Sequence, residues 1–235
     1  MRFLLTIFLL ISTYSFSQKT YEFDYLLEYE MTFYKDSIKI KNRKFFEKDK
    51  TIKQYYLTNS KKNNYIAIVT ELDSLNYKMI FTDQNGIYSN ATFLKSDLNK
   101  AEFINIECKC VHRYENRYKY QTKNYDFFKL NDTVINDKAF SLFKLESIKP
   151  KTVERKKLGT QFYIIDKETS FHLPILEFST AYEEWKTDSY FPNGIFMEKY
   201  FIDYYGFLHS NEKLINYYKI DKKIVINNAC NYTNN

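Results

Sequence analysis

The sequence predicts a mainly β protein: one large curved antiparallel sheet, shaped as an open half-barrel or a sandwich, with one or two short helices. Three observations lead to this prediction. Residues 21–33 alternate between apolar and polar side chains, with Leu26 as the exception. Short apolar segments then follow one another, separated by turn sequences, as in antiparallel hairpins. Aromatic residues make up 19% of the chain and pack well on a pleated surface.

The first strand is expected over residues 21–33, which is longer than the usual strand of about 5–6 residues and therefore favours a large curved sheet. Further strands are expected over residues 52–57 and 65–70. Residues 77–81 and 87–93 flank a turn that ends in Asn85-Gly86. Because Asn-Gly favours the tight turns of two-stranded ribbons, we expect a hairpin there.

Three more hairpins are expected farther along the chain. They join residues 134–135 to 139–140, residues 162–165 to 171–178, and residues 214–220 to 223–226, the last across Asp221-Lys222. A turn at Asn193-Gly194 is expected to lead into a strand over residues 195–204.

Helix signals are few. Ser96 is expected to cap a short turn through Lys100. Thr180 and Glu183 match a capping box, which predicts a short helix over residues 182–186 that contains Trp185.

Residues 1–17 have the features of a signal peptide. Arg2 precedes an apolar run over residues 3–11, and Ser15-Phe16-Ser17 offers small residues for cleavage before Gln18. No later segment reaches the about 20 apolar residues that a transmembrane helix needs. We therefore expect an exported, soluble protein, periplasmic or extracellular, with one antiparallel β domain over residues 18–226 and a polar tail over residues 227–235.

The net charge of +6 is concentrated in two stretches, residues 35–53 and the segment that contains Lys151, Arg155, Lys156 and Lys157. These side chains are interpreted either as ordinary solvated surface or as a contact for anionic surfaces. Nucleic acid is not expected as a partner, because an exported protein meets little of it. With only 4 glycines, the chain also contains no Gly-rich phosphate loop and no dinucleotide fingerprint.

Cys108, Cys110 and His112 alternate along an expected strand and would share one face, a ligand set that suits zinc or copper. Same-face side chains lie about 7 Å apart along a strand, so a shared ion would require a bend. Export instead favours a disulfide in which either Cys108 or Cys110 pairs with Cys230; Cys110 and Cys230 are the candidate pair. Unpaired thiols are the third interpretation.

No catalytic motif is visible. The sequence contains no nucleophile elbow and no His-Glu-x-x-His helix, and its histidines, His112, His172 and His209, lie far apart. We therefore predict no catalytic residue, no cofactor and no enzymatic activity. The alternative is a metal- or thiol-dependent enzyme centred on Cys108, Cys110 and His112.

The layout of a signal peptide, a long amphipathic strand, antiparallel hairpins and a few short helices resembles that of periplasmic lipoprotein-carrier proteins. This resemblance implies an unclosed barrel that holds acyl chains on its concave face beneath helices. The segment Phe171-His172-Leu173-Pro174-Ile175-Leu176 is also similar to the Gly-Leu-Pro-Gly-Leu-Ile motif of small exported β-rich proteins, although both glycines are absent. Neither resemblance implies catalysis.

The leading hypothesis is an exported, non-enzymatic protein whose curved sheet binds a lipid, another apolar small molecule or an envelope protein. The candidate ligand-binding residues are Phe23, Tyr25, Leu27 and Tyr29 on the inner face of the first strand, with Trp185 as a lid. The same aromatic residues can instead be ordinary core. A structural or adhesive envelope protein without a pocket, which binds through its basic stretches, is the second hypothesis.

Overall fold

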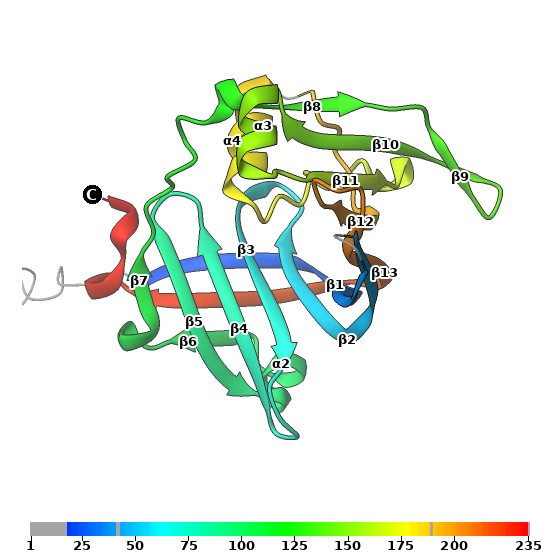
Figure 1. Ribbon diagram of the computed structural model, residues 1–235. Helices are drawn as coiled ribbons and strands as arrows, with labels where there is room; N and C mark the ends of the chain where they lie inside the picture. The colour runs from blue at the N-terminus through cyan, green and yellow to red at the C-terminus, as the bar shows by residue number, and fades with distance from the viewer. Residues whose placement is uncertain (1–17, 41–42, 189, 235) are drawn as a thin grey trace, which may run out of the picture.

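The computed structural model describes residues 18–40, 43–188 and 190–234 (Figure 1). The predicted signal peptide, residues 1–17, lies outside these residues. The described chain forms thirteen strands: β1 (Gln18–Ile40), β2 (Arg43–Asn59), β3 (Lys62–Glu71), β4 (Asn76–Asp83), β5 (Ile87–Leu94), β6 (Phe103–Ile106), β7 (Val111–Arg113), β8 (Tyr125–Lys129), β9 (Thr133–Ile135), β10 (Lys138–Ser147), β11 (Thr160–Ile165), β12 (Phe196–Ile202) and β13 (Leu208–Asn227). Its helices are α2 (Lys95–Lys100), α3 (Pro150–Lys156) and α4 (Ser179–Asp188).

All the strands belong to one sheet, in the order β7-β5-β4-β3-β2-β1-β13-β12-β11-β10-β8, with β6 beside β13 and β9 beside β10. Every pair is antiparallel except β6 with β13. The end strands β7 and β8 are not paired with each other, so the sheet stays open. In Figure 1, β3 to β7 form one half of the molecule and β8 to β12, with α3 and α4, form the other. The prediction of a large open antiparallel sheet with few helices is confirmed.

Strand β1 contributes buried side chains to both halves of the molecule and has the predicted alternation. Its side chains at alternate positions from Tyr21 to Tyr29 are buried. Tyr21 and Phe23 belong to a first core beneath β3, β4 and β5, whereas Leu27 and Tyr29 belong to a second core between β2, β10 to β12 and α4. Beyond Tyr29 the predicted alternation ends, because Met31 and Phe33 are only half-buried whereas Thr32 is buried.

Two of the predicted hairpins are confirmed. Strands β4 and β5 pair across a turn in which Gly86 has a φ of +137°. Strands β9 and β10 pair across Asn136 and Asp137, whose φ angles are 48° and 62°. Positive φ at both central residues gives the turn whose twist matches that of paired strands.

The hairpin predicted across Asp221-Lys222 is wrong, because β13 continues through both residues to Asn227. Pairing with β1 keeps the segment extended, and a register shift between Phe23 and Tyr25 absorbs the irregularity. The Lys222 ammonium donates to the carbonyl oxygen of Ala101 at 2.6 Å, so this lysine is used inside the fold rather than in a turn.

The strand predicted over residues 171–178 is also wrong, because this segment is a loop and β11 pairs with β12 instead. The loop is fixed by its backbone: Leu173 N donates to Ser60 O at 3.0 Å, and Gly194 N donates to His172 O at 2.8 Å. The His172 ring is buried, with Nδ1 2.5 Å from Leu173 O and Nε2 2.9 Å from Thr58 Oγ1. A carbonyl oxygen only accepts, so Nδ1 donates, and the neutral ring then accepts the Thr58 proton at Nε2.

Lowering the pH from 7 to 5 is expected to lower the melting temperature through His172. Burial lowers the pKa of His172 below its ordinary value, so the folded state resists a proton that the unfolded state binds below about pH 6.5. Stability is therefore lost as the pH falls through that range. His172→Gln should reduce this pH dependence in thermal melts, whereas His112→Gln, at an exposed site, should leave it unchanged. Equal pH dependence in all three proteins would contradict the assignment.

Two predicted helices are present, and one helix was not predicted. Helix α2 overlaps the turn predicted from Ser96 to Lys100, and α4 extends the predicted helix to Ser179–Asp188. The predicted caps are wrong: the N-cap of α2 is Leu94 with no side-chain hydrogen bond, and Ser96 and Thr180 each lie one residue inside their helices. Helix α3 lies in the basic stretch, with Pro150 in its first turn and Lys157 ending it at a φ of 52°. Among the described helices, none combines the length and apolar character that a membrane crossing requires.

Candidate functional site

An open cleft of about 450 Å³ lies at the start of α4. Its volume is within the range of about 300–1,000 Å³ that is usual for small-molecule sites. Most of its wall is apolar, and the residues that form this part are Tyr114, Tyr118, Tyr125, Leu145, Leu158, Phe178 and Phe201. We refer to it as the aromatic cleft.

Three neighbouring strands and two loops position this wall. Leu145 comes from β10 and Phe201 from β12, while Leu158 precedes β11. Gly159 permits the close approach of these segments, because a Cβ atom there would collide with the Ile202 carbonyl oxygen and the Phe201 ring. A side chain at position 159 would therefore push β11 and β12 apart and disturb this wall.

The far wall is the β7–β8 connection, which runs beside α4 in Figure 1. The Tyr114 hydroxyl is hydrogen-bonded to the Ser179 hydroxyl at the first residue of α4. One turn later, Asn116 Nδ2 donates to Glu183 Oε1 at 2.6 Å. These contacts hold the connection against the helix, so the cleft is built into the fold.

A second hollow, of about 380 Å³, adjoins the aromatic cleft and shares Tyr114 and Tyr118 with it. Its other lining residues are Arg113, Glu115 and Arg117, all of them exposed, so the two arginines outnumber one carboxylate. Within the described chain, neither arginine forms an ion pair with an acidic side chain. The apolar cleft thus opens beside two guanidinium groups that are available to an anion.

Beneath the cleft lies a buried ionic cluster of Glu177, Lys199, Glu212 and Tyr56. The Lys199 side chain is 4% exposed; its ammonium bonds to Glu177 and lies 3.0 Å from Glu212 Oε1. The Tyr56 hydroxyl lies 2.9 Å from Glu177 Oε2 and 2.7 Å from Glu212 Oε2. Lys199 thereby links β12 to β13 and to the loop before α4.

The charges in this cluster are fixed by their mutual contacts. Burial by itself lowers the pKa of Lys199, but the attraction of Glu177 and Glu212 outweighs it, and the pKa lies above the ordinary lysine value. Burial and the two carboxylates raise the pKa of Tyr56, which stays a protonated donor. A lysine that holds its proton is a poor nucleophile or base, so the cluster fits a structural role better than catalysis.

The ligand-binding residues predicted on the first strand are core residues. Leu27 and Tyr29 are 0% exposed and Phe23 is 1% exposed, and none of them lines the aromatic cleft. This corrects the prediction, because the alternation marks a buried face that the other strands and α4 cover completely. Tyr25 is the exception in one respect: its ring borders a separate hollow beside β13.

Trp185 is not the predicted lid of the cleft. It is half-buried on α4, packs against the second core, and lies 6.3 Å from the Tyr182 ring. The residues of α4 that reach the aromatic cleft are Ser179 and Thr180, at its first turn.

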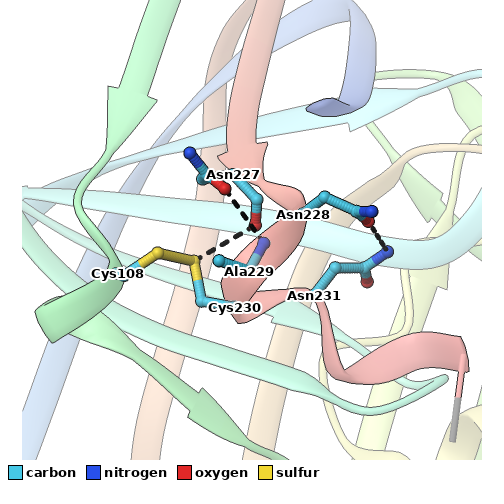
Figure 2. Close-up of a disulfide and its surroundings, with 6 residues drawn as sticks. All are labelled: Cys108, Asn227, Asn228, Ala229, Cys230 and Asn231. Atoms are coloured by element: carbon cyan, nitrogen blue, oxygen red, sulfur yellow. Dashed lines mark hydrogen bonds between the residues drawn. A yellow bond between two sulfur atoms is a disulfide. The ribbon is translucent and has the colours of Figure 1, made fainter. Parts of the chain in front are cut away.

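The disulfide joins Cys108 to Cys230, with Cα atoms 5.5 Å apart (Figure 2). The candidate pair Cys110–Cys230 is therefore wrong, and Cys110 is the free thiol. The cause is local: Cys108–Cys110 form a single 3-10 turn between β6 and β7, so the two thiols do not share a strand face. The bond ties down the C-terminal tail just after β13.

The predicted metal site is overturned by the same bond. A sulfur atom in a disulfide cannot act as a thiolate ligand, which removes Cys108 from the set. His112 lies on β7 opposite Tyr88 and is exposed. In the described part of the chain, no cluster of three or more His, Cys, Asp or Glu side chains is arranged to hold a metal ion.

The basic residues predicted as a surface contact at residues 151–157 are exposed. Lys151, Arg155 and Lys156 project from α3, and Lys157 ends it with its ammonium 4.3 Å from the Tyr204 ring. Their contact with an anionic surface stays a prediction. The side chains of residues 35–49, in the other basic stretch, lie outside the described part of the structure.

No family model and no curated protein matches the sequence. Several solved structures are similar at low identity. The Pseudomonas aeruginosa MucA/MucB complex matches with a TM-score of 0.39 and 5% identity over 83% of this chain and 52% of that one, so the chain spans about half of MucB. A putative outer membrane lipoprotein-sorting protein domain from Vibrio parahaemolyticus matches with a TM-score of 0.30 and 10% identity, over 83% and 85% of the two chains.

A DUF1329 family protein from Desulfovibrio piger matches with a TM-score of 0.31 and 10% identity, again over 83% and 85% of the two chains. One of these neighbours, the lipoprotein-sorting domain, is of the class whose layout the sequence resembles.

Proposed function

We propose that the protein is an exported, non-enzymatic binding protein that takes an anionic amphiphile such as a fatty acid, with its chain in the aromatic cleft and its head beside Arg113 and Arg117. The observation behind this proposal is an apolar cleft that shares Tyr114 and Tyr118 with a hollow in which two guanidinium groups outnumber one carboxylate, that of Glu115.

The composition of the cleft supports an aliphatic chain as its occupant. Its wall is made of aromatic rings and two leucines, whose burial by a ligand is favourable by about 25 cal/mol per Å². Its carboxylate and its amide are already engaged: Glu177 bonds to Lys199 and Tyr56, and Gln161 Nε2 donates to Tyr200 O at 2.8 Å. A polar ligand would find few free partners there, whereas a hydrocarbon chain requires none.

The arginines support an anionic head group. Guanidinium groups bind carboxylates and phosphates through paired hydrogen bonds, and a charge-assisted bond contributes about 1.5–3 kcal/mol. Because Arg113 and Arg117 flank the shared residues Tyr114 and Tyr118, a ligand whose chain fills the cleft would place its head within their reach.

Dodecanoate is the probe that tests this proposal, by isothermal titration of the protein at pH 7. The wild type is expected to bind it, and Leu158→Asp should weaken binding roughly tenfold or more, because a carboxylate replaces apolar wall. Arg113→Gln/Arg117→Gln should weaken dodecanoate binding about tenfold and leave the binding of dodecan-1-ol unchanged.

The matched control is Lys53→Gln/Lys100→Gln, which removes two exposed charges on β2 and α2, elements that contribute no residue to the cleft or to the adjoining hollow. It should bind dodecanoate as the wild type does. If both double variants weaken dodecanoate binding equally, the effect of the arginines is one of overall charge and not of their position beside the cleft. If the wild type binds neither dodecanoate nor dodecan-1-ol, the proposed function is wrong.

A further inference from the structure

Strand β13 has an open edge in the middle of the sheet. On one side β1 pairs with it from Ser210 to Asn227, with register shifts that leave Ile215 and residues 220–221 without a partner and a regular ladder from Asn216 to Lys219. On the other side β12 pairs only as far as Lys213, and β6 begins to pair only at Lys223. Between them, residues 214–222 have no strand partner on this side in the described chain, and no backbone hydrogen bond links them to a loop.

The backbone of this edge points outward at Tyr217. Its N–H donates to the side-chain oxygen of the preceding Asn216 at 2.8 Å, so it faces away from β1. In an antiparallel ladder the N–H and C=O of one residue point to the same side and alternate along the strand. The backbone N–H and C=O of Lys219 therefore point outward as well. The Tyr217 N–H is bonded to the side-chain amide of its neighbour Asn216, which a guest carbonyl can displace.

The side chains of the edge are unusual for an exposed strand. Residues 215–219 are all exposed, and Ile215 and Tyr218 reach 50% and 47%. Proteins usually protect open edges with charges, proline or a covering loop, because such edges pair with other chains. Among residues 215–219 only Lys219 is charged, and a β-branched residue and two tyrosines favour an extended, paired strand.

An open hollow of about 740 Å³ lies along this edge and would accept side chains from an added strand. Tyr217, Tyr25 and Phe171 give it an aromatic floor, with the Tyr25 ring 5.5 Å from that of Phe171. Lys61 and Lys219 give it positive charge. Its one carboxylate, Asp24, already accepts from Ser60 N at 2.7 Å and Ser60 Oγ at 2.5 Å.

We propose that an extended, acidic peptide segment of another protein adds as a strand to residues 214–222 of β13, with its apolar side chains on Tyr217 and Phe171 and its carboxylates beside Lys61 and Lys219. Main-chain hydrogen bonds provide the affinity in this mode of recognition, and pockets for alternate side chains provide the specificity. A second copy of this chain is a poorer occupant, because symmetric pairing would bring the lysines of both edges together.

The probe is a soluble peptide of about nine residues in which every second residue is in turn Val or Glu, with Ser between them, so that Val and Glu lie on one face as Tyr217 and Lys219 do. This Val/Glu peptide has as its charge control a Val/Lys peptide, in which Lys replaces each Glu. Binding is followed by fluorescence polarisation. The wild type is expected to bind the Val/Glu peptide roughly tenfold or more tightly than the Val/Lys peptide, and Lys61→Glu/Lys219→Glu should reverse this order. Lys156→Glu, on α3, should change neither affinity.

Two variants at one position isolate the backbone. Tyr217→Ala removes the ring and keeps the N–H, whereas Tyr217→Pro also removes the N–H that faces the open edge. Tyr217→Pro is expected to bind the Val/Glu peptide several-fold more weakly than Tyr217→Ala, with both folded by circular dichroism.

Equal affinities of the two variants would overturn strand addition. A wild type that binds neither peptide overturns the proposal, and if light scattering then shows concentration-dependent dimers that Tyr217→Pro abolishes, the occupant is a second copy. Amide exchange gives an independent readout: binding should slow the exchange of Tyr217 and Lys219.

Discussion

Replacing Lys199 with methionine is expected to lower the free energy of unfolding by about 3–5 kcal/mol. The substitution keeps an unbranched side chain of similar length but leaves Glu177 and Glu212 facing one another around the Tyr56 hydroxyl. Glu212 is 3% exposed, so water cannot replace the lost ammonium. Urea denaturation at pH 7, with the midpoint and the slope fitted separately, measures the loss.

Lys213→Met is the matched control. Lys213 directly follows Glu212 along β13, and its side chain is 61% exposed. Its ammonium lies 3.9 Å from Glu198, and a surface pair of this kind contributes about 0–1 kcal/mol. Similar losses in the two variants would show that the cluster is not the source of the effect. Adding Glu212→Gln to Lys199→Met should restore part of the stability, since it removes one of the two opposed charges.

The pH dependence of Lys199→Met gives a second readout. Burial already raises the pKa of Glu212, and loss of Lys199 removes the attraction that opposes this rise. The folded variant then holds a proton at a pH where an unfolded glutamic acid, with a pKa of about 4.3, has released it. Its stability relative to the wild type should therefore increase as the pH is lowered from 7 to 5. An unchanged difference would contradict the assignment.

The parts of the fold that the sequence predicts are those encoded by neighbouring residues. The alternation from Tyr21 to Tyr29 and the turns at Asn85-Gly86 and Asn136-Asp137 are local signals, and the structure follows all three. Asp221-Lys222 is a local turn signal that tertiary structure overrides, because β1 pairs with the residues of β13 before and after this dipeptide and keeps it extended. Helix α3 was not predicted. Its charged residues were interpreted only as a basic surface, although Pro150 in its first turn is a signal for the start of a helix.

The aromatic cleft was out of reach of such reasoning. Its walls come from the β7–β8 connection, β10, the start of β11, the start of α4 and β12, and no sequence pattern marks them as neighbours. The alternation in β1 shows that one face is buried, yet not whether protein or ligand covers it. Tyr29 illustrates the point, because its hydroxyl donates to the Phe196 carbonyl oxygen at 3.0 Å and its ring stacks on Phe196.

Removal of the Cys108–Cys230 bond is expected to lower the free energy of unfolding by about 2–5 kcal/mol. The two cysteines are 122 residues apart, so the bond closes most of the domain into one loop and restricts the unfolded chain strongly. It also fastens the end of β13 beside β6. The clean variant is Cys108→Ser/Cys110→Ser, because Cys108→Ser alone leaves Cys110 able to pair with Cys230. Thermal and urea denaturation without reductant measure the effect.

Cys110→Ser decides between the two possible pairings. If Cys108 is the partner of Cys230, Cys110→Ser keeps the bond and should change stability by less than about 0.5 kcal/mol, since Cys110 is a half-buried free thiol. If Cys110 were the partner, the single variant would lose as much stability as the double variant unless Cys108 took its place. Peptide mapping of Cys110→Ser and of the wild type under non-reducing conditions separates these cases. A Cys110–Cys230 peptide in the wild type would contradict the connectivity, and a Cys108–Cys230 peptide in both proteins would agree with the turn that presents Cys108, and not Cys110, to the end of β13.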